Sequence, residues 1–146
     1  MRIDRLALPR YKNLVDFEVD FDQSSSRQVV VGRNGVGKSN LLEAIVRIFR
    51  DLDLEESSAF EYTIEYFCRG VAVRVSNDLQ KSSDKSRSTA FKRTYQIADH
   101  KQSDLLPEKN YIAISESDFY RRNKRNGLHP NPLRLLPSYV FGYYSG

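Results

Sequence analysis

Three glycines, a lysine and a serine stand together in the stretch GRNGVGKS, residues 32–39. Four residues separate Gly32 from Gly37, and Lys38 and Ser39 follow directly, which is the spacing G-x-x-x-x-G-K-[ST]. Glycines allow the positive φ angles that turn successive backbone N–H groups inward, so such a loop can surround an anion. A helix that begins near Lys38 would add the positive end of its dipole. The pattern therefore predicts a phosphate-binding loop.

The side chains of this loop indicate which phosphate compound it holds. Lys38 can reach the β- and γ-phosphates of a nucleotide, and the hydroxyl of Ser39 is a ligand for Mg²⁺. Backbone groups of the loop would surround the rest of the phosphate chain. We therefore predict ATP and Mg²⁺ as cofactors. The predicted nucleotide-binding residues are Gly32, Arg33, Asn34, Gly35, Val36, Gly37, Lys38, Ser39 and Asn40, with Ser39 as the metal ligand.

Two elements must position this loop. The residues before it, RQVVVG at 27–32, form a continuous apolar run, which is typical of a strand buried on both faces. After the loop, apolar residues recur at helical spacing and predict an amphipathic helix over about residues 38–52. The members of this apolar stripe are Leu41, Leu42, Ile45, Ile48, Phe49 and Leu52.

Alternating apolar and polar residues predict a β-rich remainder. Residues 2–8 suggest an edge strand that ends at Pro9, and residues 15–22 a half-buried strand. Its inward side chains would be Val15, Phe17, Val19 and Phe21. We expect further strands at 59–69, 70–78, 89–98 and 110–115 and in the terminal stretch 136–146, a hairpin turn at Arg69-Gly70, and a basic loop at 120–132.

The composition is that of a globular domain, with 40% hydrophobic and 29% charged residues. No apolar run approaches the roughly 20 residues of a membrane span, so we expect no membrane partner. The N-terminus has no apolar stretch ending in small residues, as a signal peptide would. The single cysteine, Cys68, excludes an internal disulfide and suits a small core position, and a cytoplasmic location follows.

The charge is unevenly distributed along the chain. Residues 1–80 carry a net charge of −2 and residues 81–146 a net charge of +6. A basic cluster stands next to Phe119 and Tyr120, and basic residues beside aromatic ones can bind nucleic acid. A solvated surface loop is the other interpretation, and it is the more common one. The cluster consists of Arg121, Arg122, Lys124 and Arg125.

The local sequence is more particular than the general loop pattern. Asn34 precedes Gly35, the run NLLEA follows Ser39, and YKNLVDFEVDF lies shortly upstream. These features resemble the opening of ABC-class ATPase heads of the SMC, RecF and OLD groups. They particularly resemble AAA-family ATPases that are encoded beside bacterial restriction and anti-phage systems. The resemblance covers residues 1–52 and the last ten residues, PSYVFGYYSG.

This resemblance implies an α/β fold: the N-terminal lobe of a P-loop NTPase, in which a parallel core strand and the loop helix join an antiparallel β-subdomain. We expect one lobe over residues 1–146, with strands, loop and first helix in 1–58, a β-meander in 59–110, and a basic loop and terminal strand in 111–146. An aromatic residue upstream of the loop stacks on adenine in transporter-type relatives. For Tyr11, a core or turn position is the alternative that we favour.

The sequence also departs from the pattern of those families. An apolar strand ending in Asp-Glu and the signature LSGGQ are both missing from the 146 residues. We therefore expect a truncated head that lacks its second lobe and hydrolyses no ATP alone. The parent would hydrolyse ATP between two heads of a homodimer and act on DNA or an effector protein in DNA repair, restriction or anti-phage defence. A non-hydrolysing nucleotide-binding regulator and a nucleic-acid-binding module are the alternatives.

Overall fold

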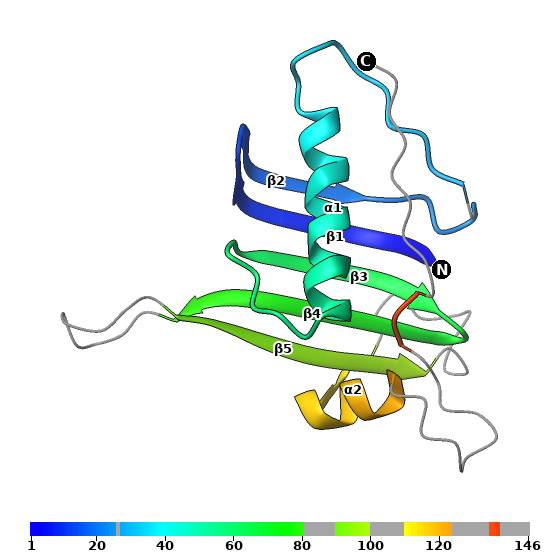
Figure 1. Ribbon diagram of the computed structural model, residues 1–146. Coiled ribbons are helices and arrows are strands. Elements are labelled where there is room, and N and C mark those ends of the chain that lie inside the picture. The colour runs from blue at the N-terminus through cyan, green and yellow to red at the C-terminus, as the bar shows by residue number, and fades with distance from the viewer. Residues whose placement is uncertain (26, 81–89, 100–109, 124–134, 138–146) are drawn as a thin grey trace.

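In the part of the chain that the structure describes, six strands form one antiparallel sheet in the order β2-β1-β3-β4-β5-β6 (Figure 1). The computed structural model describes residues 1–25, 27–80, 90–99, 110–123 and 135–137. The strands are β1 (Arg2–Tyr11), β2 (Leu14–Asp20), β3 (Tyr62–Cys68), β4 (Val71–Gln80), β5 (Ala90–Asp99) and β6 (Ile112–Ile114), and the helices are α1 (Lys38–Asp53) and α2 (Glu116–Asn123).

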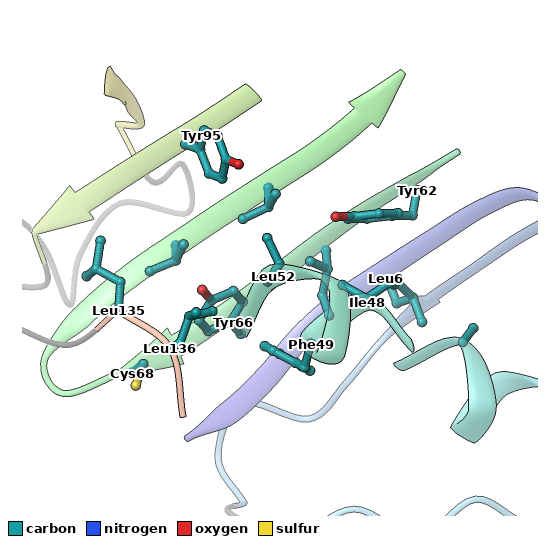
Figure 2. Close-up of a cluster of buried hydrophobic side chains, with 14 of the residues drawn as sticks. Leu6, Ile48, Phe49, Leu52, Tyr62, Tyr66, Cys68, Tyr95, Leu135 and Leu136 are labelled. Carbon is teal, nitrogen blue, oxygen red and sulfur yellow. The ribbon is translucent and has the colours of Figure 1, made fainter. Parts of the chain in front are cut away.

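Helix α1 lies across one face of this sheet, in front of β2, β1, β3 and β4 (Figure 1). Its observed range confirms the helix predicted at 38–52. The predicted apolar stripe faces the strands: Ile48, Phe49 and Leu52 are buried against side chains such as Leu6 and Tyr66 (Figure 2). The hydrophobic core therefore lies between α1 and the sheet.

The predicted meander is present. Arg69 and Gly70 both have positive φ angles, 53° and 85°, as the tight hairpin between β3 and β4 requires. The inward residues of β3 and β4 are buried, and Cys68 is a core residue as predicted. Burial raises the pKa of the Cys68 thiol.

The strand predicted at residues 27–32 is not formed in the structure. No described strand pairs with this segment, and Val29 and Val31 are 83% and 84% exposed. The continuous apolar run indicates only that both faces of a strand at this position would be apolar. A strand also needs a neighbouring strand that pairs with its backbone N–H and C=O groups. The strands described here all pair with one another in the antiparallel sheet, so the predicted parallel pairing is not seen in this part of the chain.

Two details of the N-terminal hairpin also differ from the prediction. Strand β1 runs through Pro9 to Tyr11 and is not an edge strand, since it pairs with both β2 and β3. Its register with β3 ends at Ala7, so the missing N–H of Pro9 interrupts no ladder on that side. In β2, Asp16 has a positive φ of 47°, and Val15 is exposed while Leu14 is buried.

Residues 120–123, the start of the basic loop predicted at 120–132, belong to helix α2 instead, which begins at Glu116. Ser115 caps this helix: its hydroxyl oxygen accepts a hydrogen bond from the Asp118 N–H at 3.1 Å. The run SESD at 115–118 contains this capping signal, which the sequence interpretation missed. The terminal strand predicted at 136–146 falls largely outside the described residues. Neither described helix is long and apolar enough to cross a membrane.

Burial of the Tyr66 hydroxyl gives a first prediction. Tyr66 is completely buried, and its hydroxyl has no hydrogen-bond partner among the described residues. Replacing it with phenylalanine removes an unpaired polar group, so Tyr66→Phe should raise the free energy of unfolding by about 1 kcal/mol. Denaturant unfolding measures the change.

Tyr95 is the matched control for this substitution. Its hydroxyl donates to Glu116 Oε1 at 3.1 Å, and Tyr120 lies 3.3 Å away. Tyr95→Phe should therefore lower the free energy of unfolding by about 1 kcal/mol. Equal loss of stability in both variants would show that the Tyr66 hydroxyl is satisfied in solution.

Candidate functional site

The glycine loop leads directly into the N-terminus of α1. Gly35 and Gly37 have φ angles of 84° and 104°, and Gly37 is the N-cap of the helix. The Leu41 N–H donates to the Gly37 carbonyl at 2.8 Å, which closes the first helical turn. The N–H groups of the three residues before Leu41 have no acceptor within the helix, so they point out of its positive end.

Lys38 bends back over this loop. Its Nζ donates to the carbonyl oxygens of Gly32 at 2.6 Å and Arg33 at 2.8 Å. The ammonium therefore lies against the loop backbone. A phosphate at the N-terminus of α1 would meet the N–H groups of the first helical turn, and Lys38 supplies a positive charge at the same loop.

Glycine is required at position 37 for two reasons. The positive φ of Gly37 disfavours any residue with a Cβ. A Cβ there would also lie 2.7 Å from Leu14 Cδ2 and 3.1 Å from Asn13 Oδ1. Gly35 shares the positive φ, but no atom lies within 4 Å of the place where its Cβ would stand. The loop is thus packed tightly against the β1–β2 turn at Gly37 and is open at Gly35.

The β1–β2 turn, Lys12 and Asn13, packs beside the loop and the first turns of α1, and the sequence interpretation gave it no role there. The Lys12 ammonium donates to the Glu43 carboxylate, and this contact lowers the pKa of Glu43. Asn13 contacts both the loop and Asn40. The sequence contained a signal for these contacts with α1. Asn40, Glu43 and Arg47 lie three and four residues apart, so their side chains share one face of the helix.

Tyr11 is a core residue, as favoured above. It is 5% exposed, and its ring centroid lies 4.6 Å from that of Phe60. Its hydroxyl accepts a hydrogen bond from Arg47 at 3.4 Å. The ring is therefore enclosed between the sheet and α1 and does not offer a stacking face for a base.

The structure brings the predicted residues 32–40 together around the N-terminus of α1 (Figure 1). The Ser39 residue is exposed in the first helical turn, where its hydroxyl can serve as a ligand to a metal held beside a phosphate. Among the described residues, His, Cys, Asp and Glu form no group of three or more that could hold a metal. The residues present fit Mg²⁺ as a partner of bound phosphate, not as an ion held by the protein alone.

An apolar pocket of about 390 Å³ lies beside the loop. One wall is the extended segment Val29–Val31, and the others are β2 and the beginning of α1. Its lining includes Phe17, Phe21 and Leu41. This pocket exists because the valine segment does not pair with the described strands.

The predicted nucleic-acid residues are only partly described. Arg121 and Arg122 lie in the last turn of α2, whereas Lys124 and Arg125 fall outside the described residues. The adjacent aromatic residues are buried: Phe119 is 0% exposed and its ring stacks on Tyr95 at 4.4 Å. The aromatic part of the predicted cluster therefore belongs to the core and is not available to stack on bases.

A glycine loop that enters a helix N-terminus, with a lysine turned over it, is the arrangement of a phosphate-binding loop. The chain matches the family described as AAA ATPase domain over residues 1–130. That range covers most of the 146 residues, and the chain belongs to this family.

The chain is also similar to a protein named DNA replication and repair protein RecF, from Synechococcus sp. (strain JA-2-3B'a(2-13)). The two are 29% identical over 157 residues, which cover 96% of this chain. The chain spans 39% of the length of that relative.

The two loop glycines with positive φ angles, Gly35 and Gly37, give a matched pair of substitutions. Gly35→Ala should destabilise the loop only through its positive φ, at about 1–2 kcal/mol. Gly37→Ala should cost more, because its Cβ would also press on Leu14 and Asn13. Thermal unfolding of the two variants measures the difference. Equal losses would mean that the turn and the loop are not in contact in solution.

Proposed function

We propose that this chain binds ATP with Mg²⁺ through residues 32–40 and forms the N-terminal lobe of an ATPase. The observation that carries the proposal is the loop itself. Two glycines with positive φ angles lead into an uncapped helix N-terminus, and Lys38 lies over the loop. Membership of the AAA ATPase domain family supports the same ligand.

Each residue has a defined task in this proposal. Backbone N–H groups from Asn34 to Asn40 would surround the phosphates, and the helix dipole would favour their negative charge. The Lys38 ammonium would leave the carbonyls of Gly32 and Arg33 to contact the β- and γ-phosphates. The Ser39 hydroxyl would be a ligand of Mg²⁺, which neutralises phosphate charge when bound.

We further propose that residues 27–32 become a parallel core strand when additional strands of an ATPase head cover them. Val29 and Val31 expose an apolar surface beside the loop, and the pocket next to it is apolar. A complete head of this kind would act as a homodimer that hydrolyses ATP between its two heads. A non-hydrolysing regulatory module is the alternative, and ATP turnover by the full-length protein distinguishes the two.

DNA is the partner that we propose for the full-length protein, with a role in DNA repair, restriction or anti-phage defence and a cytoplasmic location. The name of the RecF relative supports DNA, and the net charge of +6 over residues 81–146 agrees with binding to a polyanion. An effector protein is the other candidate partner. The basic residues 121–125 are the proposed contact with the DNA backbone.

Substitution of Lys38 tests the nucleotide site. Lys38→Ala removes the charged donor to the phosphates, so the affinity for MgATP should fall about 10- to 150-fold. Isothermal titration calorimetry of the purified chain measures it. Arg50→Ala is the control, because Arg50 is also a basic residue of α1 but lies in its last turn. Equal affinities of Lys38→Ala and the wild type would contradict the proposed site.

A salt series tests the contact with DNA. If the basic cluster meets DNA phosphates, the logarithm of the binding constant should fall with the logarithm of salt concentration, by roughly 0.9 per phosphate contact. Changing Arg121, Arg122, Lys124 and Arg125 to alanine should reduce this slope by up to about 3–4 units on any sequence.

The control for the salt series carries substitutions in the N-terminal part of the chain. Arg10→Ala with Arg50→Ala removes two exposed basic residues from outside the cluster. This double variant should retain the slope of the wild type. An unchanged slope in the four-fold variant would end the nucleic-acid interpretation of residues 121–125.

A further inference from the structure

Asn13, in the β1–β2 turn, contacts the glycine loop through its side-chain amide. Its Nδ2 donates to the carbonyl oxygen of Gly35 at 3.2 Å. The two residues are far apart in sequence, and Gly35 is the central glycine of the loop. The contact therefore connects the sheet to the part of the loop that would surround a phosphate.

This hydrogen bond determines where the next backbone N–H points. In a trans peptide, the C=O of one residue and the N–H of the following residue point in opposite directions. The described chain contains no cis peptide bond. With the Gly35 carbonyl directed toward Asn13, the Val36 N–H points away from the turn. An N–H that points away from the turn can donate to an anion held in such a loop.

Asn40 fixes the orientation of the Asn13 amide. The Asn40 Nδ2 donates to Asn13 Oδ1 at 2.6 Å. An amide has one accepting and one donating end, so this bond leaves the NH₂ of Asn13 facing the Gly35 carbonyl. The first turn of α1 thus holds Asn13, and Asn13 in turn holds the loop.

We propose that Asn13 is a positioning residue of the phosphate loop: it orients the Gly35–Val36 peptide so that the Val36 N–H is available to a nucleotide phosphate. The inference rests on the proposed nucleotide binding and deepens it. Asn13 touches no phosphate in this proposal. It acts by holding a flexible peptide in the binding orientation before the ligand arrives, which reduces the conformational cost of binding.

The neighbouring residues of the turn separate this role from simple attachment of the turn to the helix. Tyr11 and Lys12 already contact α1 through Arg47 and Glu43. Neither of those hydrogen bonds involves the loop backbone. Lys12→Ala is therefore a matched control, since it weakens the contact between turn and helix and leaves the Gly35 carbonyl paired.

The test compares Asn13→Ala and Lys12→Ala with the wild type in two measurements. Calorimetry with MgADP and MgATP should show an affinity about 5- to 10-fold lower for Asn13→Ala, the loss of one hydrogen bond, and little change for Lys12→Ala. Nuclear magnetic resonance of the nucleotide-free chain should show a shifted Val36 amide nitrogen in Asn13→Ala alone, because its peptide carbonyl has lost a donor.

Each outcome decides the inference. A Val36 amide unchanged in Asn13→Ala would overturn it, and so would a nucleotide affinity equal to that of Lys12→Ala. Asn13→Asp provides a second variant: it keeps the acceptor for Asn40 but lacks the donor to Gly35, so it should bind nucleotide at least as weakly as Asn13→Ala. Wild-type affinity in Asn13→Asp would also overturn the inference.

Failure of the proposed function would look different. A wild-type chain that binds neither MgADP nor MgATP would overturn nucleotide binding. The positioning of the loop by Asn13 would then be decided by the Val36 amide alone.

Discussion

The packing of α1 on the sheet is the interaction on which the other features of this chain depend. Ala44, Ile48 and Leu52 are completely buried, and each large apolar side chain buried in this way contributes about 1.5–3 kcal/mol. The helix can bury this face only in one orientation, because its apolar residues occupy a single stripe. Its N-terminus is thereby held at the β1–β2 turn, where the loop meets Asn13 and Leu14.

At that end of α1, close packing and backbone geometry act together. The turn brings Leu14 against Gly37, and Lys12 has a positive φ of 52° that lets the chain reverse between β1 and β2. The conformation of the loop is restricted at position 37. The backbone has a positive φ where the helix begins, and the turn leaves no room for a Cβ, so glycine is the residue that fits there. Hydrogen bonds from Asn13 and Asn40 complete this arrangement.

At the other end of α1, Arg93 of β5 connects three segments. Its guanidinium donates to the Glu56 carbonyl at 2.6 Å, just after α1, and to the Tyr120 hydroxyl of α2 at 3.0 Å. Burial in this cluster raises the pKa of Tyr95, and its hydroxyl donates to Glu116. Helix α2 is thus attached to the same core as the glycine loop, and its aromatic residues form that attachment.

The sequence by itself determined the features that depend on neighbouring residues. The spacing of Gly32, Gly37, Lys38 and Ser39 indicated the loop, and the stripe from Leu41 to Leu52 indicated α1, because both patterns are local. The tertiary structure alone decided which segments meet. It brought Asn13 to Gly35, buried Phe119 and Tyr120, and left Val29–Val31 unpaired with any of the described strands. Such contacts join residues far apart in the chain, and no local pattern of side chains specifies the partner.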